Sequence, residues 1–166
     1  MNILLVGAGA VGQVYGRHLA RAGHRITFFV KEKHVAALAG GLPLHRLGHL
    51  RTQHEVWSDY AIISAVEEVA ATAWDQVWLC MPSDALRSAL SQQVIAAVGD
   101  ATVISLPPGP EDMALVRAHL PSQATLVQGL ITFISYQSPL PGHEGPEGIA
   151  YFLSPLAPGM FSGPHQ

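Results

Sequence analysis

Cysteine, charge and long apolar runs are all scarce in this sequence. Cys80 is the only cysteine, so no internal disulfide can form, which indicates a reducing compartment. Charged residues make up only 13% and the formal net charge is -3, a balance that argues against nucleic acid and membrane surfaces as partners. No apolar run approaches the roughly 20 residues that span a bilayer, and the N-terminus lacks the basic segment of a targeting signal. We therefore expect a cytoplasmic protein that binds a small molecule.

The residues that are present favour one compact α/β domain. The chain has 166 residues, of which 49% are hydrophobic, enough for a core of its own. Short aliphatic runs alternate with amphipathic helical patterns, which is typical of βαβ units and a mainly parallel sheet. The expected strands of this sheet cover residues 2–6, 26–30, 75–81 and 102–106. One helix is expected to begin at Pro82-Ser83 and to continue through Val98.

The rest of the chain predicts further strands. Residues 42–47 and 50–57 each predict a short strand around Gly48, and the C-terminal portion is rich in strand patterns at residues 125–135 and 148–153. A loop of prolines and glycines separates the last two. We expect one domain over residues 1–153 and an irregular tail or linker over residues 154–166.

A glycine motif follows the first expected strand. Residues 7–12 read GAGAVG, a G-x-G-x-x-G pattern that gains weight from the strand before it and the amphipathic helix after it. Gly7 permits a tight turn, Gly9 lets the backbone approach a pyrophosphate, and Gly12 lets the helix pack closely on the strand. The alternative is a glycine-rich turn that binds nothing. The expected phosphate-binding loop of a Rossmann-type, doubly wound fold comprises Gly7, Ala8, Gly9, Ala10, Val11 and Gly12.

The residues after the second expected strand bear on the choice of dinucleotide. The adenosine ribose lies at this point, where an acid accepts hydrogen bonds from the ribose hydroxyls and a base pairs with a 2′-phosphate. The sequence here is Lys31-Glu32-Lys33, and these are the only two lysines in the chain. Their position favours NADP over NAD. Glu32 keeps NAD open as the alternative, and a solvated strand end would also carry such charges.

The opening residues, MNILLVGAGAVGQVYGRHLARAGHRITFFVK, resemble the N-terminal NADP-binding domain of the ketopantoate reductase (2-dehydropantoate 2-reductase) family. The resemblance continues more loosely through AALAGGLPLH, WDQVWLCMPSDALRSAL and ATVISLPPGPEDM. It implies an NADP-dependent oxidoreductase that reduces a 2-oxo acid or a similar carbonyl, with Lys31 at the 2′-phosphate. The family adds a helical C-terminal domain that carries a lysine general acid. The resemblance thus implies that residues 154–166 lead toward a helical domain absent from this chain.

Two positions depart from the family pattern. Pro82 stands where the family usually has a lysine that helps to position substrate, and Pro107-Pro108-Gly109 replaces a segment with an asparagine near the nicotinamide. No lysine follows Lys33, and no tyrosine is followed four residues later by lysine, the pattern of short-chain dehydrogenases. Ketone reduction needs a group that protonates or polarises the developing alkoxide, so the catalytic residue is left unassigned. The competing hypothesis is a non-catalytic nucleotide-binding or assembly module that has lost the reductase side chains.

Ligands of open α/β sheets collect at the carboxyl ends of the strands. At the third and fourth expected strands, the residues expected to line the nucleotide cleft through backbone and shape are Met81, Pro82, Leu106 and Pro107.

The histidines do not predict a metal site. His45, His49 and His54 gather on an expected hairpin, but their spacing matches no familiar zinc motif. We expect Cys80 to be a packed thiol rather than a nucleophile.

Apolar side chains near the C-terminus suggest a partner, either a second copy of the chain or a separate helical domain; they are Leu156, Met160 and Phe161.

Overall fold

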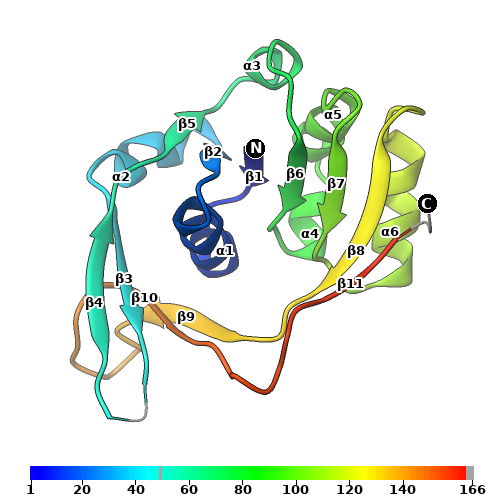
Figure 1. Cartoon of the computed structure of the whole chain (residues 1–166). Helices are drawn as coiled ribbons and strands as arrows, with labels where there is room; N and C mark the ends of the chain where they lie inside the picture. Colours follow the sequence, from blue (N-terminus) through cyan, green and yellow to red (C-terminus); the bar gives the residue numbers. More distant parts are fainter. Residues whose placement is uncertain (49, 164–166) are drawn as a thin grey trace.

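The computed structural model describes residues 1–48 and 50–163 and folds them around a mainly parallel sheet (Figure 1). The strand order is β11-β8-β7-β6-β1-β2-β5, and every neighbouring pair is parallel except β11 with β8. The strands of this main sheet are β1 (Asn2–Val6), β2 (Arg25–Phe29), β5 (Ala61–Ile63), β6 (Gln76–Leu79), β7 (Thr102–Ser105), β8 (Thr125–Leu130) and β11 (Met160–Ser162). The α/β fold class expected from the sequence is confirmed.

Side chains of alternate parity divide the core into two layers, as the period of a strand requires. In β1, Ile3 and Leu5 join the cluster beneath helix α1, whereas Leu4 and Val6 join the cluster on the opposite face. All four are at most 3% exposed. The helices are α1 (Ala10–Arg21), α2 (Val35–Ala39), α3 (Val66–Ala70), α4 (Ser83–Leu86), α5 (Ala89–Ala96) and α6 (Pro110–His119), with a 3-10 turn over Glu32–His34.

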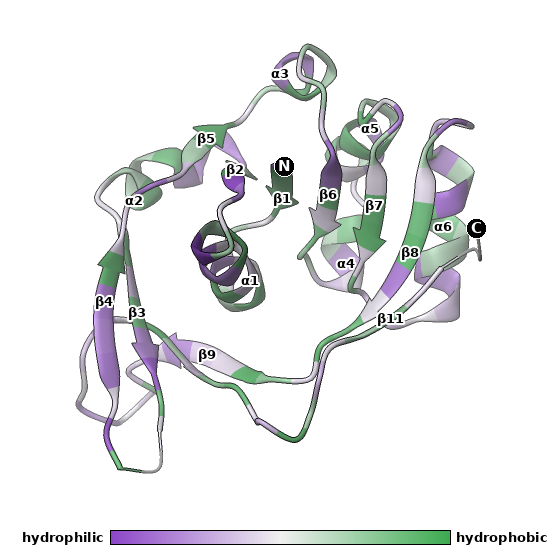
Figure 2. Cartoon of the chain, viewed as in Figure 1, coloured by the Kyte–Doolittle hydropathy of each residue, from purple (hydrophilic) through white to green (hydrophobic). Residues whose placement is uncertain are grey.

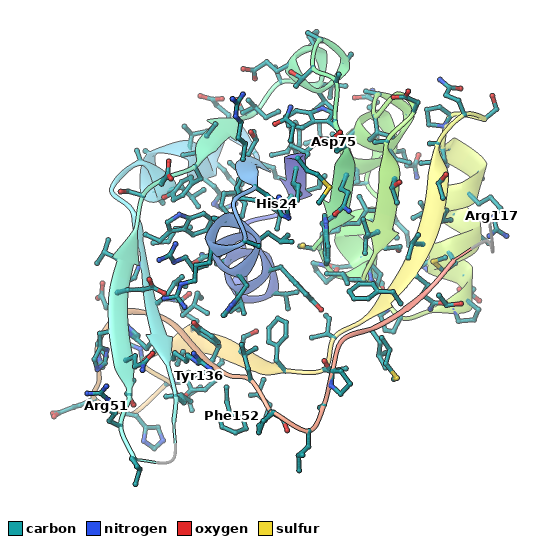
Figure 3. The ribbon with its side chains drawn as sticks, viewed as in Figure 1. His24, Arg51, Asp75, Arg117, Tyr136 and Phe152 are labelled. Atoms are coloured by element: carbon teal, nitrogen blue, oxygen red, sulfur yellow. The ribbon has the colours of Figure 1, made fainter. Side chains whose placement is uncertain are left out.

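A second, four-stranded sheet packs against the outer side of α1. Its order is β4-β3-β10-β9, with bounds β3 (Leu42–Arg46), β4 (Gln53–Trp57), β9 (Ile134–Ser138) and β10 (Gly148–Phe152). Figure 2 shows β4 and β9 as largely hydrophilic, in contrast to the hydrophobic β1 of the main sheet. The burial pattern explains this difference, because β4 and β9 are mostly exposed or half-buried, whereas β1 is buried along nearly its whole length. Side chains fill the space between α1 and the β3–β4 hairpin (Figure 3).

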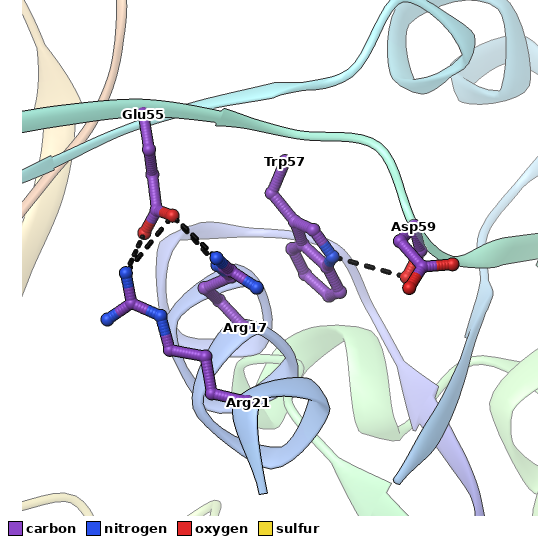
Figure 4. Close-up of polar contacts among 5 residues, drawn as sticks. All are labelled: Arg17, Arg21, Glu55, Trp57 and Asp59. Carbon is purple, nitrogen blue, oxygen red and sulfur yellow. Dashed lines mark hydrogen bonds and ion pairs between the residues drawn. The ribbon is translucent and has the colours of Figure 1, made fainter. Parts of the chain in front are cut away.

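The β3–β4 hairpin is fixed to α1 by one carboxylate and one indole (Figure 4). Glu55 accepts hydrogen bonds from Arg17 (2.7 and 2.9 Å) and from Arg21 (3.1 Å). Partial burial opposes ionisation of Glu55, but the two guanidinium groups outweigh it and lower its pKa. Trp57 lies over Gly16, where an added Cβ would come within 3.1 Å of the indole. A glycine on this face of α1 therefore lets the second sheet approach closely.

The expected helix from Pro82 to Val98 is wrong as a single element. It divides into α4 and α5 at Arg87 and Ser88. The Ser88 hydroxyl accepts a hydrogen bond from the Ser91 N–H (3.3 Å) and so begins a new helix. The apolar spacing continues across the break because Leu86 and Val94 pack into the same core layer.

Two strand expectations also change. Residues 125–135 form two strands, since β8 belongs to the main sheet and β9 to the second sheet. Residues 154–166 were expected to be irregular, but Met160–Ser162 pair antiparallel with β8. Neither β5 nor α3 is predicted by the sequence patterns, because β5 has three residues and α3 five, too few to show a period. The hairpin expected around Gly48 is confirmed as β3 and β4, while His49 lies outside the described residues.

Candidate cofactor cleft

Gly7 and Gly12 shape the loop that joins β1 to α1. Gly7 has φ +102°, a conformation that side chains disfavour, and its N–H donates to the Phe29 carbonyl (3.0 Å). A Cβ on Gly12 would lie 2.2 Å from the Gly7 carbonyl oxygen and 3.2 Å from Cβ of Cys80. Only glycine therefore fits at position 12, where the first turn of α1 presses on the loop.

Gly9 has the opposite environment. An added Cβ there would meet nothing within 4 Å, because Gly9 faces an open cleft. It is the N-cap residue of α1, whose first turn contains no acidic residue and which no side chain among the described residues caps. Such a helix start offers N–H groups and a partial positive charge to an anion. Gln13 steadies the loop from one turn further on, since its Nε2 donates to the Ala8 carbonyl (2.8 Å).

The cleft has a volume of about 820 Å³ and lies at the carboxyl ends of β1, β2 and β6. The main sheet reverses its strand order at β1, with β2 on one side and β6 on the other. This is the topological switch point at which doubly wound sheets bind ligands. The opposite wall comes from the second sheet, through Pro43 in β3 and Gln137 in β9, and from Glu147 directly before β10. A volume in this range is typical of small-molecule and cofactor sites.

The predicted site residues divide into those on the cleft wall and those behind it. Gly7, Ala8, Gly9, Lys31 and Met81 line the cleft. Among the described residues, the other predicted positions lie outside its lining: Ala10, Val11, Gly12, Pro82, Leu106 and Pro107. Ala10, Val11 and Gly12 form the first turn of α1, where backbone groups rather than side chains could act.

The β7 end is set back from the cleft for a packing reason. Leu106 is 3% exposed and belongs to the core beneath α1. Its side chain lies against Gly129, where an added Cβ would come within 2.8 Å of it. Pro107 is buried as well. Hydrophobic burial therefore turns these two side chains inward.

Several polar side chains on the cleft wall were missed by sequence reasoning. Gln13 lies in α1, four residues after the N-cap Gly9, so helical spacing could have indicated it. His34 follows Lys31 by three residues in the 3-10 turn, which also places it on the wall. Gln137 lies in β9 of the second sheet, and Glu147 directly precedes β10. No sequence signal places that sheet beside the glycine loop.

The basic and acidic side chains that follow β2 point to different places. Lys31 and His34 line the cleft, whereas Glu32 is not part of the lining. The carboxylate of Glu32 instead accepts a hydrogen bond from the Ser64 hydroxyl (2.5 Å). Both Lys31 and Glu32 are exposed. The base is thus available to a ligand in the cleft, while the acid is held against the end of β5.

The loops after β6 and β7 are braced by a buried carboxylate. Asp112, in the first turn of α6, is 2% exposed and accepts hydrogen bonds from Ser83 Oγ and Arg87 Nη1, each at 2.6 Å. The Ser83 hydrogen bond and the Arg87 charge hold the pKa of Asp112 below its usual range against the effect of burial. Neither Pro82 nor Pro108 carries a group that can exchange a proton. The hydrogen bonds of Asp112 therefore fix these loops, but positions 82 and 108 supply no acid or base.

The other candidate side chains from the sequence, which are histidines of the β3–β4 hairpin and Cys80, have contacts typical of structural roles. His54 Nδ1 lies 2.8 Å from His45 Nδ1, and His45 Nε2 lies 2.9 Å from the Glu147 carbonyl. Burial raises the pKa of the Cys80 thiol, which disfavours the reactive thiolate. Among residues 1–48 and 50–163, no three histidine, cysteine or acidic side chains gather as a metal site would require.

Within residues 1–48 and 50–163, no helix combines the length and the apolar character that crossing a membrane requires.

The family model of ketopantoate reductase PanE/ApbA matches residues 3–145. The chain belongs to this family. No curated protein matches the sequence. Among solved structures, a PanE/ApbA family ketopantoate reductase from Ralstonia eutropha JMP134 is 26% identical, with a TM-score of 0.67, over 83% of this chain and 44% of that one. A 2-dehydropantoate 2-reductase from Geobacter metallireducens GS-15 is 17% identical, with a TM-score of 0.72, over 98% of this chain and 49% of that one.

A third similar structure is D-mandelate dehydrogenase with NADH and anilino(oxo)acetate. It is 21% identical, with a TM-score of 0.72, over 93% of this chain and 46% of that one. At these identities the last two structures show the shared fold alone. This chain spans about half the length of these solved relatives.

Proposed function

We propose that this chain is the NADP-binding part of a ketopantoate-reductase-like enzyme that reduces a 2-oxo acid or a similar carbonyl with NADPH. The observation that carries the proposal is the pairing of Gly9 with Lys31 on the wall of one cleft. Gly9 opens the start of α1 to a pyrophosphate, and Lys31 supplies a positive charge where the 2′-phosphate of NADP lies in this type of fold.

The residues present fit a dinucleotide. Its pyrophosphate would lie at the uncapped start of α1, held by backbone N–H groups near Ala10 and Val11, and its 2′-phosphate beside Lys31. When bound, the nicotinamide supplies a hydride to the carbonyl carbon. The residues of this chain bind and orient the dinucleotide. The proton that the product oxygen needs must come from a group outside positions 82 and 107–109, because prolines and a glycine occupy them.

Calorimetric titration with NADPH and, in parallel, NADH tests the cofactor. We expect tighter binding of NADPH and loss of that preference in Lys31→Ala. Lys33→Ala is the matched control, since Lys33 carries the same charge two residues away but is absent from the cleft lining. Gly9→Asp should abolish binding of both nucleotides, because its carboxylate would repel the pyrophosphate. Binding that survives Gly9→Asp would refute the assignment of the glycine loop.

A non-catalytic nucleotide-binding or assembly module is the second candidate, favoured by Pro82 and Pro108 at family positions that usually carry polar side chains. The two candidates differ in turnover. Consumption of NADPH with a panel of 2-oxo acids, measured on the longest natural form of the protein, supports the enzyme. NADPH binding without turnover in that form supports the module.

The partner is also a proposal, either a second copy of this chain or a separate helical domain. Leu156, Met160 and Phe161 are 91%, 57% and 50% exposed, which leaves apolar surface for a contact. A single molecular weight in sedimentation across concentrations would argue against self-association.

We also propose the cytoplasm as the compartment, which suits a chain whose single cysteine forms no internal disulfide.

A further inference from the structure

The end of strand β5 lies directly beside the proposed ribose end of the cleft. β5 pairs with β2 in parallel, with Phe29 opposite Ile63, and the Val30 N–H donates to the Ile63 carbonyl (3.1 Å). This register places Ser64, the first residue after β5, next to the turn that contains Glu32. The pairing of this three-residue strand thus places the Ser64 hydroxyl beside the residues that follow β2.

Ser64 is held in place through its backbone rather than its side chain. Glu68 reaches back from α3 and accepts hydrogen bonds from the N–H groups of Ser64 (3.1 Å) and Ala65 (3.0 Å). The Ser64 hydroxyl is left to donate to Glu32. Replacing this hydroxyl therefore changes the contact with Glu32 and leaves the start of α3 intact.

Glu32 is the acidic residue of this turn, and an acid at this point affects cofactor choice. It is exposed, it adjoins Lys31, and Lys31 and His34 on either side of it both line the cleft. A carboxylate free to swing into the cleft would repel a 2′-phosphate and accept a hydrogen bond from an unphosphorylated ribose. Its contact with Ser64 removes it from that position.

We propose that Ser64 is a positioning residue for cofactor specificity: by holding Glu32 away from the cleft, it favours a 2′-phosphorylated dinucleotide over one with a free 2′-hydroxyl. This inference rests on the proposed function, since it requires that a nicotinamide dinucleotide binds with its ribose near Lys31. It concerns the ratio of two affinities. Tight or weak binding as such does not decide it.

The experiment is a double-mutant cycle over Ser64→Ala and Glu32→Gln, with NADPH and NADH affinities measured by calorimetry at low salt, where exposed charges act most strongly. For Ser64→Ala alone, we expect the ratio of NADPH to NADH affinity to fall about threefold, the size of effect typical of one exposed charge contact. In the Glu32→Gln background, Ser64→Ala should leave the ratio unchanged, because no carboxylate remains to be released. Ser64→Thr keeps the hydroxyl and should keep the ratio.

Each other outcome overturns a definite part of the reasoning. An unchanged ratio in Ser64→Ala, with both nucleotides still bound, refutes the role of Ser64 and leaves the proposed function standing. An equal fall in both backgrounds shows that Ser64 acts without Glu32, which also refutes the inference. If the unaltered chain binds neither nucleotide, the proposed function fails and the inference fails with it. Melting curves of all variants should coincide, which would separate specificity from folding.

Discussion

Adding a single methyl group at Gly12 tests how the glycine loop is packed against α1. The Cβ of Gly12→Ala would lie 2.2 Å from the Gly7 carbonyl oxygen, whereas Cβ atoms in folded proteins essentially never come within 3.0 Å of such a neighbour. The loop must therefore move by about 1 Å, a shift that a close-packed interior resists. The loop cannot retreat freely, because the Gly7 N–H is bonded to the Phe29 carbonyl at 3.0 Å.

The expected cost follows from two opposing effects. Overpacking of this kind costs about 1–3 kcal/mol, and more where backbone must move. Alanine gains up to about 1 kcal/mol over glycine in a helix interior, and less in a first turn. We expect the free energy of unfolding of Gly12→Ala to fall by about 2 kcal/mol, which for a chain of this length lowers the melting temperature by about 4–8 °C.

Urea unfolding followed by circular dichroism measures this change, and Gly9→Ala is the matched control. A Cβ on Gly9 meets nothing within 4 Å, so its only stability effect is weaker N-capping, at most about 1 kcal/mol. Gly9→Ala should instead weaken NADPH binding, since its methyl group enters the cleft. Equal stability of Gly12→Ala and the unaltered chain would refute the close packing described for this loop.

Three further changes test the surrounding structure. Asp112→Asn should cost about 2 kcal/mol at pH 7 because Ser83 and Arg87 lose their carboxylate. Since the folded pKa of Asp112 is lowered, chemical unfolding at several pH values should show this difference intact above about pH 4 and shrinking below it. Tyr151→Phe should leave stability unchanged or raise it by up to about 1 kcal/mol, measured thermally, because its buried hydroxyl has no hydrogen-bond partner among the described residues. Glu55→Gln should cost about 1 kcal/mol in low salt and less in high salt, measured by urea unfolding, because it removes the charge that faces two guanidinium groups.

Local patterns explain why the central part of the fold could be predicted. The run from Asn2 to Val6, the glycine triplet and the apolar spacing of α1 all describe neighbours in the chain, so their structure follows from residues close in sequence. The same holds for the β3–β4 hairpin around Gly48. The positions of Gly7, Gly9 and Lys31 on one cleft wall follow from the βαβ connection alone.

The second sheet shows where local patterns stop being informative. β3 pairs with β10 in parallel, with His45 opposite Ala150, a contact between residues about a hundred positions apart. No period in either strand identifies its partner. Leu106 is a comparable case: the sequence places it at a strand end facing ligand, but the contact with Gly129 draws it into the core.

The sequence by itself determined the elements whose cause is local: the glycine turn, the βαβ unit around it and the basic residues after β2. It also shows that no proton-exchanging side chain stands at positions 82 and 107–109. The tertiary structure alone decided which charges share the cleft. Lys31 and Glu32 are adjacent in the chain, and both are exposed. Their side chains differ in surroundings because the register of β5 against β2 brings Ser64 to Glu32. The physical reason is that hydrogen bonds between strands fix positions that side-chain patterns within one strand leave free.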